Sequence, residues 1–234
     1  MRLIAITLFL SSFFYTAKAL TPADTVNFFP KHSISIGTDL LLNFTGCLGH
    51  RSILRYEYKG ILYVQMGGGH IHFGQDKVYN NVRGYTSKGS FIMPGAGLII
   101  PLVKSREVSF VFGTNYIRSF YSERGNIEIL NQFWGTKVKR PLRLDNSVLD
   151  ALQIQVGGQL TFKYFRVIPA LHYNSFLGSL SPSQSPFYTS SGGGNKYQSY
   201  FVPGLGRVNE GNFLNQYGAS FTIIYNFPPS GKKR

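Results

Sequence analysis

Two histidines, His70 and His72, stand two residues apart in a glycine-rich stretch that could form a strand. On a strand such a pair shares one face, where two imidazoles can bind the same metal ion. The nearest acidic residue is Asp76, and no cysteine, aspartate or glutamate stands at ligand spacing. We therefore expect two polar residues near an outer rim, with no metal and no cofactor.

The sequence carries none of the compact motifs that mark a hydrolase or a nucleotide-binding site. It has no G-x-S-x-G, no H-E-x-x-H and no P-loop. Some residues could serve a protease or an acyltransferase at a barrel rim, although none stands beside a nucleophile: His50, His70, His72, Asp76, Asp145 and Asp150. We predict that the protein is not an enzyme, with a lipid-modifying or proteolytic barrel enzyme as the weaker alternative.

The elements that must position these side chains are strands. Residues 216–227 alternate almost perfectly over about twice the length of an average soluble strand. One face is polar except for Ile224, and the other carries Tyr217, Ala219, Phe221, Ile223, Tyr225 and Phe227. Aromatic residues at both ends of an apolar face are typical of a strand that crosses a membrane. We expect this face to contact lipid.

The same pattern recurs and predicts an all-β fold, an eight-stranded antiparallel up-and-down transmembrane β-barrel. A small soluble barrel is the alternative. The expected strands cover residues 33–43, 51–59, 60–73, 87–101, 107–121, 148–163, 165–177 and 213–227. The periplasmic turns are then short, and the outer loops end with the long segments 122–147 and 178–212. Eight strands leave just enough room for their own side chains, which disfavours a general porin.

The N-terminus predicts export to the outer membrane. Arg2, an apolar run and Ala17-Lys18-Ala19 form a secretory signal peptide, with cleavage after Ala19. We divide the chain into this signal (1–19), a periplasmic N-terminal segment (20–32), the outer-membrane barrel (33–227) and a basic periplasmic tail (228–234). Cys47 is the single cysteine, so the chain can form no internal disulfide.

The formal net charge of +14 narrows the expected partners. In a cytosolic protein it would suggest nucleic acid, which we do not expect for an exported chain. The expected partners are outer-membrane lipid and lipopolysaccharide, whose phosphates are anionic. Plain solubility of long loops explains the charge as well. An envelope protein partner is also possible on this sequence.

Charged residues stand at strand positions that should face the barrel interior. A low-dielectric interior tolerates charges only when they are paired. We therefore expect a plug of ion pairs and hydrogen bonds that includes Asp39, Arg55, Glu57, Arg166 and His172. The alternative, a proton relay or a narrow conductance, has no specific motif in its support.

Short motifs follow one another in a fixed order through most of the predicted barrel. They are Ile36-Gly37-Thr38-Asp39-Leu40, Tyr85-Thr86-Ser87-Lys88-Gly89-Ser90-Phe91, Phe112-Gly113-Thr114-Asn115-Tyr116, Phe133-Trp134-Gly135, Tyr200-Phe201-Val202-Pro203-Gly204 and Ile224-Tyr225-Asn226-Phe227-Pro228. The ordered set resembles a Bacteroidota family of outer-membrane β-barrel proteins of unknown function. The resemblance implies a fold and a location, and no catalytic residue. Met66-Gly67-Gly68-Gly69 departs from the family pattern, which leaves the register of that strand open.

The third and fourth outer loops carry the residues that we expect to make contacts. Aromatic residues stand beside cations in the third loop, and they follow a Gly/Ser-rich tip in the fourth. The expected contact residues are Phe133, Trp134, Tyr197, Tyr200 and Phe201. A third loop folded over the barrel mouth would explain Phe133 and Trp134 equally well. We hypothesise a structural or accessory component of an envelope complex; the alternative is a surface-exposed binding protein or adhesin.

Overall fold

The computed structural model describes residues 32–40, 47–79, 82–103, 107–130, 137–162, 164–177, 199–209 and 217–227. The predicted signal peptide and C-terminal tail, and the N-terminal segment up to residue 31, lie outside these ranges. The strands are β1 (His32–Asp39), β2 (Cys47–Tyr58), β3 (Leu62–Tyr79), β4 (Val82–Pro101), β5 (Val108–Leu130), β6 (Lys137–Thr161), β7 (Phe165–Phe176), β8 (Ser199–Val202), β9 (Gly206–Asn209) and β10 (Tyr217–Asn226). No helix in the described residues is long and apolar enough to cross a membrane.

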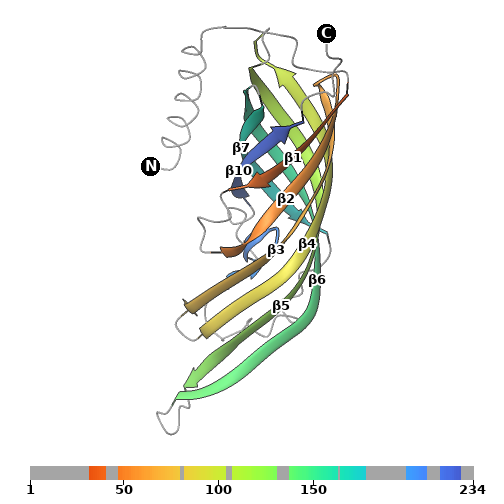
Figure 1. Ribbon diagram of the computed structural model, residues 1–234. Coiled ribbons are helices and arrows are strands. Elements are labelled where there is room, and N and C mark those ends of the chain that lie inside the picture. The colour runs from red at the N-terminus through yellow and green to blue at the C-terminus, as the bar shows by residue number, and fades with distance from the viewer. Residues whose placement is uncertain are drawn as a thin grey trace, which may run out of the picture.

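Eight of these strands close into one antiparallel barrel (Figure 1). From β1 to β7 each strand pairs with the next, β10 pairs with β7, and β10 closes the ring against β1. The predicted eight-stranded up-and-down barrel is therefore confirmed. The register that the glycine run left open is also defined, because Gly67 of β3 pairs with Ile53 of β2 and with Met93 of β4.

Side chains alternate between the inside and the outside of the barrel wall. On β5, for example, Val111 is fully buried, whereas its neighbours Phe110 and Phe112 are exposed on the outer face. The period of two follows from the pleat of a strand. The alternation in the sequence therefore reflects one strand face that fills the barrel interior and one that forms its outer surface.

Four neighbouring strands continue well beyond the others. β3, β4, β5 and β6 have 18, 20, 23 and 25 residues, whereas β10 has 10. Figure 1 shows them leaving the barrel as a curved sheet at the end opposite the short turns. We call this projection the arm, comprising residues 74–79 of β3, 82–86 of β4, 124–130 of β5 and 137–143 of β6.

The arm corrects the expectation that residues 122–147 form a loop. Backbone pairing between β5 and β6 continues from Glu123 with Leu144 to Leu130 with Lys137. Alternation of apolar and polar residues fades there, because neither face of the projecting sheet lies against the barrel wall. A register shift between Tyr121 and Glu123 marks the base of the arm, where Asn146 has a φ of 56°.

Candidate functional site

A layer of charged and amide side chains fills the middle of the barrel. Arg166 Nη1 donates a short hydrogen bond to Glu57 Oε1, and both side chains are buried. Arg55 donates to Gln65 Oε1 at 3.2 Å and 2.8 Å, and its guanidinium lies 4.2 Å from the centre of the Tyr63 ring. These contacts satisfy charges that would otherwise be costly to remove from water.

A second ion pair lies nearer the mouth of the barrel. Arg51 Nη1 is 3.3 Å from Asp39 Oδ2, and the backbone N–H of Phe221 donates to Asp39 Oδ1 at 3.2 Å. This pair joins β1 and β2 to β10 across the seam that closes the barrel. Arg51 was not among the residues expected from the sequence, although it shares the inward parity of Arg55.

Amide side chains connect the walls between these pairs. Gln65 donates to Asn115 at 2.7 Å, Asn115 to Gln153 at 3.1 Å, and Gln153 to Asn174 at 3.0 Å. The chain crosses the barrel from β3 to β7 through β5 and β6. We call these amides and the charged residues of the two ion pairs and Arg55 the polar layer.

The expected interior residues therefore lie inside the barrel. Asp39 pairs with Arg51, Glu57 pairs with Arg166, and Arg55 bonds to Gln65. His172 also faces inward, where it lies over Gly218. A Cβ atom at that position would come within 2.2 Å of His172 Nε2, so the imidazole occupies space that only glycine leaves.

The mouth of the barrel is closed by a hairpin from the fourth outer loop, β8–β9. Phe201, Val202 and Leu205 are buried in an apolar cluster with wall residues that include Phe73, Phe91, Met93, Ile117 and Tyr121. The Phe201 ring stacks on that of Phe73 at a centroid distance of 4.6 Å. Wall hydroxyls donate to the hairpin backbone, Ser87 to the Phe201 carbonyl and Ser119 to the Pro203 carbonyl, both at 2.7 Å.

This placement corrects the expected contact surface. Phe201 is only 5% exposed, so it packs inside the mouth and is not available to a partner. The signal was present in the sequence, because Phe201, Val202 and Leu205 flank the Pro203-Gly204 turn, and such an apolar run is unusual in an exposed loop. Phe133, Trp134 and Tyr197 lie outside the described residues, and so does the side chain of Tyr200.

A carboxyl group at the base of the arm is linked to the hairpin. The backbone N–H of Phe201 donates to the Tyr85 hydroxyl at 3.1 Å, and that hydroxyl donates a short hydrogen bond to Glu123 Oε1. Glu123 Oε2 is buried and has no hydrogen-bond partner in the described residues. Burial raises the pKa of Glu123 to about 7, an effect that the hydrogen bond from Tyr85 opposes.

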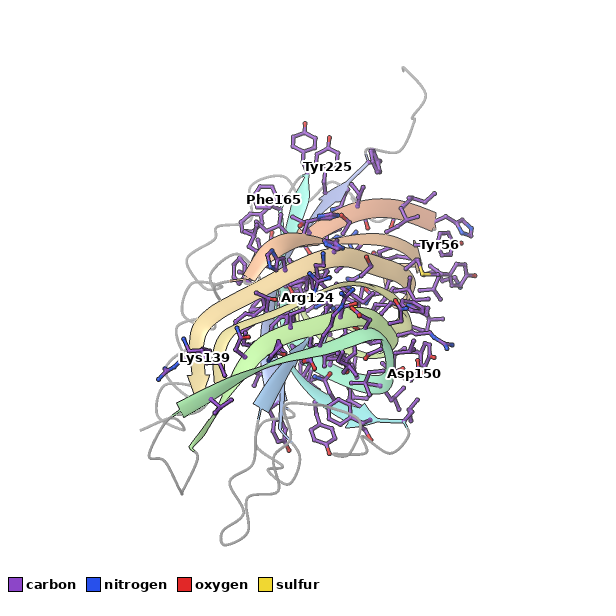
Figure 2. All side chains as sticks on the ribbon, turned by 90° about the horizontal axis from the view of Figure 1, so that it is seen from below. Tyr56, Arg124, Lys139, Asp150, Phe165 and Tyr225 are labelled. Atoms are coloured by element: carbon purple, nitrogen blue, oxygen red, sulfur yellow. The ribbon has the colours of Figure 1, made fainter. Side chains whose placement is uncertain are left out.

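The outer wall carries the residues of the last strand that we expect to contact lipid. Tyr217, Tyr225 and Phe227 are exposed, and Phe221 and Ile223 are half-buried among their outer-face neighbours. Ile224 points into the barrel and is fully buried. Figure 2 shows Tyr225 and Phe165 at the same end of the barrel, with the rings directed away from it.

Among the candidate catalytic and metal-binding residues, His50, His70, His72 and Asp145 are exposed, Asp150 is half-buried, and the side chain of Asp76 lies outside the described residues. His50 and His70 are direct cross-strand partners, and His70 Nδ1 is 3.0 Å from Ser90 Oγ. In the described part of the chain no carboxylate contacts His70, which leaves the hydroxyl–imidazole pair without the third member of a triad. No group of three potential ligands in the described residues is placed to hold a metal ion.

The fold and its interior define a class: a small closed β-barrel whose lumen is occupied by its own side chains. No protein-family model and no curated protein matches the chain. Among solved structures it is similar to the N-terminal β-barrel domain of OprF from Pseudomonas aeruginosa, with 12% identity, a TM-score of 0.34, and 83% of this chain and 97% of that chain covered.

Two further solved structures show a comparable likeness. CarO2 from Acinetobacter baumannii is 11% identical with a TM-score of 0.39, covering 83% of this chain and 97% of that chain. Ail from Yersinia pestis, solved with the heparin analogue sucrose octasulfate, is 10% identical with a TM-score of 0.32, covering 84% and 96%. Likeness at this level carries no argument about function, which must come from the residues of this chain.

Proposed function

We propose that this protein is an outer-membrane β-barrel that acts by contact, as a structural or accessory component of an envelope complex, and has no catalytic role. The observation that carries the proposal is a projecting arm on a barrel whose interior is filled by the polar layer and the hairpin. A filled lumen offers no route for solutes, whereas the arm extends a large surface away from the wall. The predicted signal peptide and the resemblance to the Bacteroidota barrel family support the same location.

The outer face of the wall supports membrane insertion. On β4 the outward apolar residues include Ile92, Leu98 and Ile100, exposed by 48%, 40% and 47%. From Ile92 to Leu102 these outward residues cover about ten residues of the chain, or roughly 34 Å along the strand. At a strand tilt of roughly 40° this corresponds to about 26 Å, close to the height of the apolar band of outer-membrane barrels. We call this outward apolar surface the belt.

Aromatic residues border the belt at the end with the short turns. Tyr56, Phe165, Tyr225 and Phe227 are exposed there, and Phe165 is the direct cross-strand partner of Tyr225. At the other end the belt gives way to polar contacts, where the Tyr116 hydroxyl donates to Asp150 at 2.7 Å. Aromatic residues at the membrane boundary are the expected anchors of a barrel.

Two lysine substitutions test the membrane location. Leu98 lies within the belt, whereas Ser90, the cross-strand partner of Phe120, lies at its outer edge, where the cost of a charge falls to about 0–1 kcal/mol; both side chains are exposed on the outer face of β4. In lipid, Leu98→Lys should cost about 2–4 kcal/mol and impair insertion into vesicles, whereas Ser90→Lys should insert as the wild type does. In a water-soluble barrel both substitutions would be tolerated equally, and that result would refute the location.

Contact through the arm is tested by removing the part of it that β5 and β6 form. Arg124 and Arg143 are direct cross-strand partners, so an Asn-Gly turn can replace residues 125–142 and connect them. The barrel should still assemble, because this change leaves the strands of the wall intact. Chemical cross-linking in intact cells should recover an envelope protein with the wild type and not with the shortened variant.

Each outcome of the cross-linking separates the candidate functions. If the wild type and the shortened variant recover the same partners, the arm is not the contact surface and the proposal fails. A partner found only among components added from outside the cells would instead favour the alternative, a surface-exposed binding protein. Heat-dependent migration of both proteins in electrophoresis provides the control for correct barrel assembly.

A further inference from the structure

A group of cations lies on the outer wall just beyond the belt, at the end where the arm begins. Lys88 of β4 and Arg124 and Arg143, on the facing strands β5 and β6, are exposed on the outer face. We call these three residues the cation band. The last outward apolar side chains before it are Phe120, 44% exposed, and Val148, 47% exposed.

Strand pairing holds these cations close together, and their mutual repulsion destabilises the protein when no anion is bound. Arg124 and Arg143 are direct cross-strand partners, and like charges in that position repel each other. Lys88 pairs with Ser122, which places it diagonally across from Arg124, at roughly 7–8 Å between Cα atoms. The sheet thus holds positive charges together on one outward surface.

The carboxylates described nearby neutralise only one member of the band. Asp145 forms an ion pair with Arg143, and Asp150 pairs with Arg118 at 3.7 Å and accepts the Tyr116 hydroxyl. No carboxylate whose side chain the structure describes lies within ion-pair distance of Lys88 or Arg124. The only acidic neighbour on that part of β5, Glu123, points inward and is fully buried. Lys88 and Arg124 are therefore available to bind an external anion.

The height of the band above the belt indicates where that anion lies. Lys88 is level with Ser122, two residues beyond Phe120, and Arg124 is four residues beyond it. These separations are roughly 7 and 14 Å along the strand, or about 5 and 10 Å along the membrane normal at a tilt of about 40°. The headgroup layer of a bilayer occupies roughly 5–8 Å on each side of the hydrocarbon.

We infer that the cation band binds the phosphate groups of lipopolysaccharide in the outer leaflet, an inference that rests on the membrane location proposed above. Lys88 supplies an unpaired charge at headgroup height. Arg124 supplies a second one about 2 Å above that layer, a distance that its long side chain can span. Phe120 and Val148 contact the acyl chains beneath them. Arginine and lysine bind phosphate through charge-assisted hydrogen bonds. Bound phosphate would also remove the repulsion between Arg124 and Arg143.

The test compares two variants of the detergent-solubilised full chain that each lose two positive charges. Lys88→Gln with Arg124→Gln alters the band, and Lys137→Gln with Lys139→Gln removes equal charge from the far end of the arm, where Figure 2 shows Lys139. Each protein is titrated with lipid A carrying two phosphates, with the same lipid A after dephosphorylation, and with inorganic phosphate as a competitor.

We expect the band variant to bind bisphosphorylated lipid A roughly thirtyfold more weakly than the wild type, and the control variant to bind within about twofold of it. Dephosphorylated lipid A should bind the wild type and the band variant alike. Unchanged affinity in the band variant, or an equal loss in the control, would overturn the inference. Competition by inorganic phosphate at concentrations similar to those of the lipid would show a free-phosphate site instead.

Failure of this inference is separable from failure of the proposed function. If Leu98→Lys and Ser90→Lys insert equally well into vesicles, the membrane location itself is refuted. If Leu98→Lys alone is impaired and the band variant keeps wild-type affinity for bisphosphorylated lipid A, only the lipopolysaccharide site is refuted.

Discussion

At the scale of single residues, the barrel depends on how charges are paired across its lumen. Glu57 of β2 and Arg166 of β7 are 109 positions apart in the chain, yet they form a buried ion pair. Both positions could be assigned to the interior from strand parity. Their partnership depends on the way in which the closed sheet brings β2 opposite β7, and no local pattern contains that information.

Removing one member of this pair should destabilise the barrel. Glu57→Gln leaves the Arg166 guanidinium buried without its carboxylate, which should cost about 3–5 kcal/mol in the free energy of unfolding. Denaturation in urea, followed by circular dichroism of the strands and by migration in electrophoresis, measures the loss. Adding Arg166→Met to Glu57→Gln should restore much of the stability, since both charges are then absent. A single variant as stable as the wild type would show that the pair contributes little.

Gly204 is a second residue whose role is set by its surroundings. It has a φ of 82° in the turn between β8 and β9, where the N–H of Leu205 donates to the Val202 carbonyl at 3.0 Å. Pro203 followed by glycine at positive φ is the pattern of a type II turn. A Cβ atom at this position would also lie 2.6 Å from the Phe91 ring.

Gly204→Ala should therefore release the hairpin from the barrel mouth. The backbone conformation alone costs about 1–2 kcal/mol for alanine, and the contact with Phe91 adds to it. Faster trypsin cleavage after Arg207, with an intact barrel, would report the release. Gly74→Ala is the matched control, because its Cβ would meet Thr86 at an ordinary 3.9 Å. Equal cleavage in both variants would argue against a docked hairpin.

At the scale of elements, we predict that docking of the hairpin β8–β9 depends on the protonation of Glu123, which lies beyond the belt at the base of the arm and is linked to the Phe201 N–H through Tyr85. Its folded pKa of about 7 is above the ordinary value of 4.5. The folded state therefore keeps a proton that the unfolded chain releases, so this contribution to stability is full below pH 4.5 and is lost as the pH rises through about 7. The docked hairpin should be tighter at about pH 5 than at about pH 8.

Hydrogen exchange of the Phe201 and Val202 amides, corrected for intrinsic rates, tests this dependence. In the wild type, protection should fall between about pH 5 and about pH 8. Glu123→Gln should remove most of the change, because its amide carries no charge at either pH. Equal protection at both pH values in the wild type would show that the carboxyl group does not control docking.

The arm shows why element boundaries were harder to predict than element types. Apolar and polar residues alternate along the wall strands because one strand face lines the barrel interior and the other forms its apolar outer surface. The two faces of the arm do not differ in this way. Its pairing is nonetheless regular, and even Pro141 is accommodated opposite Asn126. β7 pairs with β6 only from Ala151 onward, so among the described strands β5 is the only one that pairs with β6 at Pro141. The other edge of β6 is open there, and the side of Pro141 that lacks an N–H can face it.

At the scale of the whole molecule, the barrel should not conduct. Arg55, Glu57, Gln153 and Gln159 are each at most 2% exposed, so side chains fill the lumen, and the hairpin covers the mouth. In planar bilayers the purified wild type should give no large, stable conductance. Deleting residues 199–209 should remove the cover without opening a pore, because the polar layer remains below. Large channels from the wild type would contradict the filled interior.

The strand-based class of this protein, the number of barrel strands and the face on which most wall residues lie could be predicted from the amino-acid sequence. These properties follow from a local period of two and from turn residues, which any strand displays whatever its partners. Inward positions such as Asp39, Arg55 and Glu57 could therefore be assigned from the alternation alone, as could the outer face of β10.

Which inward residues meet, and which loop residues are buried, depends on the closed three-dimensional fold. Asp39 pairs with Arg51, and Phe201 packs on Phe73, because closure of the sheet and docking of the hairpin bring distant segments together. The cation band arises in the same way, since Arg124 and Arg143 become neighbours through pairing of β5 with β6. Contacts of this kind depend on register and closure across the whole barrel, which a local pattern does not encode.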